Sequence, residues 1–125
     1  MNATVYDDYE ALLKNETIDF VEIITDVDSH EMFTIMAAEK GIHVVCQKPM
    51  AATLEQASNM VETCRNAGVK FFIHENFRWQ APIRKLKTAL DAGVIGKPFK
   101  ARVSYCSAFP VFDNQPFLAT LSQFI

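Results

Sequence analysis

Hydrophobic residues along the chain follow two spacings, one typical of amphipathic helices and the other of buried strands. Apolar positions three or four residues apart predict four helices, at about residues 7–14, 30–41, 54–67 and 82–92. Short continuous apolar runs lie between them and predict three strands, at residues 19–25, 43–46 and 69–74. Helices and strands are therefore expected to alternate along the chain.

Capping signals support these boundaries. Asp28 followed by Glu31 is an aspartate version of a capping box and predicts the start of the second helix. Thr53 followed by Gln56 predicts the start of the third. Pro82 suits the first turn of the fourth helix. Glycines are expected to end the last three helices, at Gly41, Gly68 and Gly93.

This pattern predicts an α/β fold. Strands that are apolar on both faces and separated by single amphipathic helices are typical of a parallel sheet covered by helices. Residues 99–106 differ, because apolar and polar side chains alternate there with a period of two. Such alternation predicts an antiparallel strand with one solvated face. We therefore expect a partial Rossmann-like domain over residues 1–96 and the beginning of a second, α+β domain over residues 97–125.

Composition narrows the class of partner and the compartment. The formal net charge is −3, with charges of both signs scattered along the chain, which gives no electrostatic footprint for nucleic acid or an anionic membrane. No apolar run approaches the roughly 20 residues of a membrane helix. The three cysteines form no C-x-x-C pair, which suits a reducing compartment. We expect a cytoplasmic protein with no nucleic-acid or membrane partner and no metal site.

Polar residues follow each predicted strand, in the stretches TDVDSH, QKPM and HENFRW. In an open parallel sheet, ligands bind beyond the carboxyl ends of the strands. These stretches are therefore expected to converge on one edge of the sheet. Candidate site residues on that edge are Asp26, His30, Gln47, Lys48, Asn76 and Arg78.

The order of these motifs resembles the Gfo/Idh/MocA oxidoreductases. The likeness consists of T-x-x-x-x-H, then K-P after a short strand, then N-x-R with an aromatic residue, then GVIGKP. It covers the chain from Tyr6 to about Phe117. The resemblance implies an NAD- or NADP-dependent oxidoreductase acting on a sugar, cyclitol or related polyol. It also implies that Lys48 matches the catalytic lysine, which lies beside the nicotinamide and hydrogen-bonds the substrate hydroxyl.

Further roles follow from the same resemblance. Gln47 stands where the family has a glutamate that contacts the nicotinamide ribose, and an amide can still hydrogen-bond a hydroxyl. The cofactor-binding set is then Thr25, His30, Gln47, Pro49 and Asn76, and the substrate-binding pair is Lys48 and Arg78. Structural alternatives stay open. His30 can be an ordinary first-turn helix residue, Lys48 a solvated loop residue, and Asn76 and Arg78 can tie down a loop.

Two motifs of the family are absent from the 125 residues. There is no G-x-G-x-x-G turn, and none of the three histidines is followed by aspartate at the third position. One hypothesis is therefore a fragment of an NAD(P)-dependent oxidoreductase that is inactive as an isolated chain. The alternative is a non-catalytic half-Rossmann module that binds a partner through an open sheet edge. We also expect homo-oligomer formation, and a cis or sharply turned Lys48-Pro49 bond.

Overall fold

The computed structural model describes residues 3–104, 106, 108, 110–114 and 116 of the chain. Residues 1–88 form one compact unit and residues 89–125 a second. The first unit is α/β, as the hydrophobic pattern predicted, and it holds every candidate site residue. No helix in the described part of the chain is long and apolar enough to cross a membrane.

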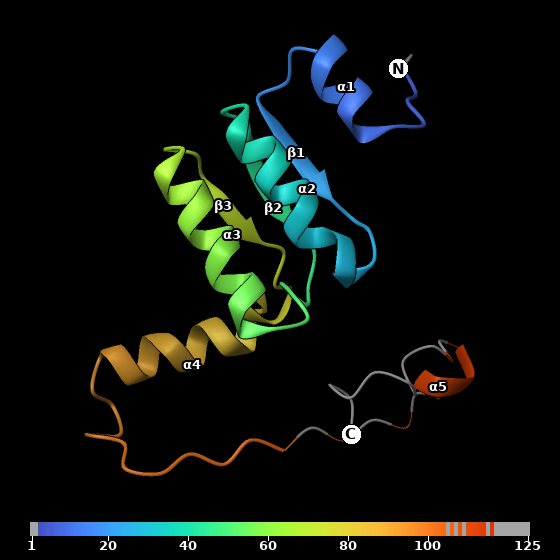
Figure 1. Ribbon diagram of the computed structural model, residues 1–125. Coiled ribbons are helices and arrows are strands. Elements are labelled where there is room, and N and C mark those ends of the chain that lie inside the picture. Colours follow the sequence, from blue (N-terminus) through green and yellow to red (C-terminus); the bar gives the residue numbers. More distant parts are fainter. Residues whose placement is uncertain (1–2, 105, 107, 109, 115, 117–125) are drawn as a thin grey trace. The chain divides into compact units, whose positions relative to one another are not determined.

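A three-stranded parallel sheet forms the centre of the first unit. Its strands β1 (Phe20–Ile23), β2 (His43–Cys46) and β3 (Phe71–Ile73) lie in the order β1-β2-β3. Helix α1 (Tyr9–Asn15) precedes β1, while α2 (Val27–Glu39) and α3 (Leu54–Asn66) make the two crossovers. Figure 1 shows α2 and α3 side by side against the sheet. Each strand runs in the same direction, so all three carboxyl ends meet at one edge.

The core lies between the sheet and these helices. Val21 and Ile23 of β1 and Val44 and Cys46 of β2 point into it, where they meet Met60 of α3. Further members of this cluster are Leu13, Ala37 and Ile42. The alternate residues of β1 are exposed, so the described helices cover one face of the sheet. Coverage of both faces, which the strand composition suggested, is therefore not found among the described residues.

Local capping explains where the helices begin. Thr53 and Gln56 form the predicted capping box. In it the backbone N–H of Gln56 donates to Thr53 Oγ1 at 3.2 Å. The start predicted for α2 is wrong. Its cap is Asp26, whose carboxylate accepts from the backbone N–H of Ser29, and the helix therefore begins at Val27. A carboxylate at this position also interacts favourably with the helix dipole.

A short 3-10 helix, η1 (Phe77–Trp79), follows β3 and leads into α4 (Ala81–Asp91). Pro82 lies in the first turn of α4, as predicted. The apolar side chains of α4 were expected to face inward. Ile83 and Leu86 are instead exposed, because no described segment covers that side of the helix.

The second unit contains little regular structure among its described residues. Gly93 and Gly96 adopt positive φ and close turns after α4, and α5 (Val111–Asn114) is a single helical turn. The strand predicted at 99–106 is absent from residues 99–104, and Tyr105 lies outside the described residues. A lone alternating segment forms a strand only when another strand pairs with it, and no described residue supplies that partner.

Candidate functional site

The three loops that carry the candidate residues begin side by side. Ile23 is in register with Cys46, and Cys46 with Ile73. The pairing continues past the strands, because the Gln47 backbone N–H donates to the Ile23 carbonyl at 2.9 Å and the His74 N–H donates to the Cys46 carbonyl at 2.8 Å. The loops after β1, β2 and β3 therefore leave the sheet from one edge, as the sequence predicted.

His30 connects the first two of these loops. Its Nδ1 lies 3.0 Å from the carbonyl oxygen of Pro49, and its Nε2 lies 3.2 Å from the carbonyl oxygen of Thr25. The side chain is 1% exposed. Both partners are acceptors, so a neutral imidazole can donate to only one of them, whereas an imidazolium can donate to both. Both ring nitrogens of His30 are thus occupied by backbone carbonyls. The side chain connects the loop after β1 to the loop after β2 from the protein interior.

Lys48 lies on the loop that His30 anchors. The Lys48-Pro49 peptide bond is cis, as predicted. The Lys48 backbone N–H donates to Oε1 of Gln47 at 2.9 Å, which orients the glutamine amide. The Lys48 side chain is exposed, and its ammonium has no hydrogen-bond or ion-pair partner among the described residues. The loop therefore presents one cation and one oriented amide, whose NH₂ group is still available to donate.

The loop after β1 carries a small hydroxyl network. The Ser29 hydroxyl lies 2.7 Å from Thr25 Oγ1, and both side chains are at the N-terminus of α2. The Asp26 carboxylate accepts from Ser29 and is thereby committed to capping that helix. Thr25 thus keeps its hydroxyl at the sheet edge, with Ser29 fixing its direction.

The loop after β3 contributes an amide and a guanidinium. Asn76 immediately precedes η1, and its side chain makes no capping hydrogen bond. Arg78 is exposed, with its guanidinium carbon 6.0 Å from the centre of the Trp79 ring. A second guanidinium, from Arg84, lies 5.9 Å from the same ring. The sequence analysis missed this pairing across the η1–α4 junction, although a tryptophan and two arginines within seven residues were a visible signal.

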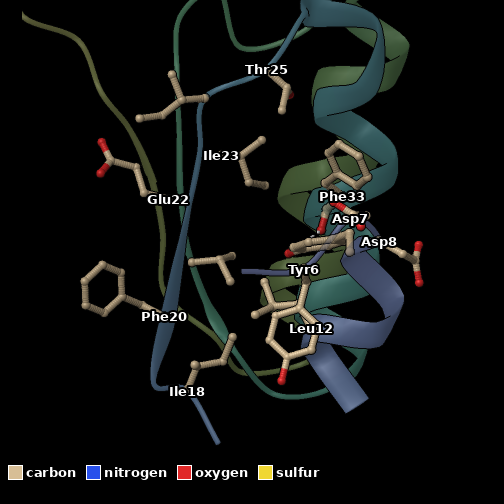
Figure 2. A pocket seen from close by; sticks show the side chains of 13 residues that line it. Tyr6, Asp7, Asp8, Leu12, Ile18, Phe20, Glu22, Ile23, Thr25 and Phe33 are labelled. Carbon is tan, nitrogen blue, oxygen red and sulfur yellow. Dashed lines mark hydrogen bonds between the residues drawn. The ribbon is translucent and has the colours of Figure 1, made fainter. Parts of the chain in front are cut away.

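Two of the clefts on the first unit bear on function. One, of about 420 Å³, is formed around Trp79 by η1 and α4. The other, of about 540 Å³, runs along β1 beside α1. Figure 2 shows Ile23 and Phe33 on the helix side of β1, whereas Phe20 and Glu22 point to the opposite face. Among the described residues β1 pairs only with β2, so its other edge is open beside this cleft.

The polar groups at the sheet edge suit the nicotinamide half of a dinucleotide. Hydroxyl, amide and ammonium groups can hydrogen-bond a ribose and a carboxamide. A pyrophosphate usually takes its donors from a glycine-rich turn that opens a helix. The four glycines lie elsewhere. Three of them follow the ends of α2, α3 and α4, and Gly96 lies in the turn after α4, all with positive φ. The edge therefore offers donors of the kind that a ribose and a carboxamide accept, and the 125 residues contain no G-x-G-x-x-G turn.

The chain resembles known proteins over most of its length. Residues 1–75 match the family described as "Oxidoreductase family, NAD-binding Rossmann fold". The D-apiose dehydrogenase of Rhizobium rhizogenes is 47% identical over 120 residues, which is 96% of this chain and 35% of that protein. The myo-inositol 2-dehydrogenase of Thermotoga maritima is 31% identical over 99 residues, which is 79% of this chain and 30% of that protein.

A solved structure shows the same fold. The crystal structure of an oxidoreductase from Agrobacterium radiobacter, in complex with NAD+, L-tartaric acid and magnesium, is 47% identical with a TM-score of 0.85. The match covers 91% of this chain and 33% of that one. The chain therefore spans about a third of the length of the relatives it matches.

Proposed function

Because this chain belongs to the Gfo/Idh/MocA family of NAD-binding oxidoreductases, we propose that it carries the lysine-bearing side of a site that oxidises a sugar or polyol with NAD or NADP. One observation carries the proposal. An exposed ammonium, that of Lys48, lies at the carboxyl edge of a parallel sheet on a loop held from below by a buried histidine. A lysine that served only solubility would need no such anchor.

Four side chains of the edge have a direct part in this proposal. Lys48 hydrogen-bonds the hydroxyl that is oxidised, and in its neutral amine form Nζ takes the proton of that hydroxyl. Gln47 donates its amide to a ribose hydroxyl, in a direction fixed by the Lys48 backbone N–H. Asn76 hydrogen-bonds the carboxamide of the nicotinamide. Thr25 borders the site on the side where α2 begins. The nicotinamide, when bound, supplies the hydride acceptor.

His30 takes a positioning part. The family resemblance alone places it among the cofactor-binding residues, but its two contacts are to backbone carbonyls of the loops. We assign it the task of keeping the Thr25 and Pro49 loops in register, so that the Lys48 side chain leaves the sheet edge in one direction. Pro49 serves the same end by contributing the carbonyl that His30 contacts.

We further propose that the 125 residues alone do not turn over. Hydride transfer requires a dinucleotide held at both ends and a second group to pass on the proton from Lys48. The sequence contains neither a glycine-rich phosphate turn nor an H-x-x-D motif. NADH is therefore expected to bind weakly, with a Kd on the order of 1 mM.

Activity and binding are tested together. The purified chain is titrated with NADH by nicotinamide fluorescence and then assayed with NAD⁺ or NADP⁺ and D-apiose, myo-inositol or D-glucose. We expect weak binding and no turnover above buffer. Turnover that disappears in Lys48→Ala would refute the inactivity and support the role of the lysine. Turnover that survives Lys48→Ala would refute that role.

A second candidate function is favoured by the open edge of β1. Phe20 is 61% exposed on the edge strand, Ile24 is exposed beside it, and the 540 Å³ cleft adjoins both. An unpaired parallel edge with exposed apolar side chains favours association. We propose that a second copy of the chain covers this edge in solution, whether or not a ligand is bound.

A further inference from the structure

We propose that the cleft around Trp79 binds the oxyanion group of a negatively charged sugar derivative, either a sugar acid or a sugar phosphate. The anionic part of this inference is independent of the site at Lys48. The sugar part rests on the proposed function. Six residues line the cleft: Arg78, Trp79, Ile83, Arg84, Lys87 and Thr88.

Two positive charges gather at one ring in this cleft. The guanidinium carbons of Arg78 and Arg84 lie 6.0 and 5.9 Å from the centre of the Trp79 ring. Neither guanidinium has a carboxylate partner within the described segments. Both guanidiniums line one cleft, so an oxyanion bound there is attracted to two positive charges. The positive charge of Arg78 and Arg84 therefore suits the binding of an anion.

The contacts with the ring do not compete with such an anion. Both distances are at the upper limit for a cation–π interaction, which is worth about 0.5–1 kcal/mol at an exposed position. A hydrogen bond from a charged donor is worth about 1.5–3 kcal/mol, and a guanidinium presents a planar fork that matches a carboxylate or a phosphate. An arriving oxyanion can therefore recruit both side chains from the ring.

Trp79 provides the surface for the rest of the ligand. Its side chain is 63% exposed, which is unusual for so large an apolar group and leaves much of the indole to solvent. The flat ring is a suitable base for the C–H face of a sugar, and the indole N–H can donate to a hydroxyl. Ile83 extends the apolar wall from α4, and it too is exposed.

Cleft size favours a small ligand over a macromolecule. The volume of about 420 Å³ falls within the range of roughly 300–1,000 Å³ usual for small-molecule sites. The Thr88 hydroxyl already donates to the Arg84 carbonyl at 3.0 Å. A single monosaccharide with one anionic group therefore satisfies the size, the charge and the aromatic wall.

The chain contains one tryptophan, so its fluorescence reports on this cleft alone. The full chain is titrated without cofactor, using D-glucuronate, D-glucose 6-phosphate, D-glucose and inorganic phosphate. We expect saturable quenching by one or both anionic sugars and at least about tenfold weaker binding of D-glucose. The two anionic probes distinguish a carboxylate from a phosphate ligand.

Variants then test the residues. Arg84→Gln and Arg78→Gln are each expected to weaken the anionic sugar about tenfold, while Lys85→Gln, on the same helix but outside the cleft, leaves it unchanged. Far-UV circular dichroism checks that each variant is folded. The inference is overturned if D-glucose or inorganic phosphate binds as tightly as the anionic sugars, or if folded Arg78→Gln and Arg84→Gln both bind like wild type. NADH titration of the same variants reports on the Lys48 site separately.

Discussion

His30 Nδ1 lies 3.0 Å from the carbonyl oxygen of Pro49, nineteen positions along the chain. The contact joins the first turn of α2 to the loop that carries Lys48. The other ring nitrogen contacts the Thr25 carbonyl, so one buried side chain fixes two loops at the carboxyl edge of the sheet. Because this arrangement depends on backbone carbonyls, it constrains the path of the chain regardless of which side chains the loops carry.

Replacing His30 by alanine is expected to destabilise the chain. The change removes the side chain that contacts the Thr25 and Pro49 carbonyls and opens a cavity, which together cost about 2–5 kcal/mol. Urea unfolding followed by circular dichroism measures the loss. His43→Ala is the matched control, since His43 is half-buried and its Nδ1 accepts from the Lys70 backbone N–H, and it should cost less. Equal stabilities of the two variants would contradict the anchoring role.

Stability is expected to fall in alkaline solution. Burial raises the pKa of the Cys46 thiol from its ordinary value of 9.0 to about 11. Between these values the unfolded chain loses the proton and the folded chain keeps it, so the free energy of unfolding decreases as pH rises. The Cys46 contribution to this loss is about 1 kcal/mol between pH 9 and pH 10. Burial also raises the pKa of Tyr9, to about 12, which extends the trend.

Two cysteine variants isolate this effect. Urea unfolding under reducing conditions at pH 7.5, 9 and 10 gives the slope for each chain. Cys46→Ala should flatten the slope, whereas Cys106→Ala should not, because Cys106 is exposed. A slope that is the same with and without Cys46 would show that this thiol does not titrate as its burial requires.

Phe20→Lys is expected to weaken self-association of the chain. A lysine on an edge strand opposes pairing with another strand, and it removes an exposed aromatic ring beside the β1 cleft. Light scattering coupled to gel filtration at micromolar concentration gives the molar mass. Leu54→Lys, at an exposed position on α3, is the control and should associate like wild type. A wild-type chain that is monomeric under these conditions would refute association through β1.

The sequence predicted the parallel α/β unit because its signals are local. Strand β2 was predicted residue for residue, and the Thr53–Gln56 capping box was correct, since both depend on neighbours within a few positions. The start of α2 was wrong for a related reason. Asp26 and Asp28 are equally good caps by residue type, and the backbone path after β1 selects Asp26.

Contacts between residues far apart in the sequence could not be predicted from local patterns. That His30 contacts Pro49 depends on α2 packing over β2, and no spacing within the helix encodes it. The exposure of Ile83 and Leu86 is a second case, because an amphipathic stripe predicts which face is apolar but not whether anything covers it. Convergence of Thr25, Lys48 and Asn76 on one edge followed from strand direction, whereas the Trp79 cleft required side-chain geometry.

The central claim is that the nicotinamide end of the cofactor lies against the loops at the carboxyl edge. Amide chemical-shift mapping of the ¹⁵N-labelled chain with NADH, at concentrations on the order of the millimolar Kd expected for so incomplete a site, tests it most directly. We predict that the shifts concentrate on Thr25, Gln47, Lys48 and Asn76. Shifts confined to the Trp79 cleft or the β1 cleft, or no shifts at all, would contradict the account.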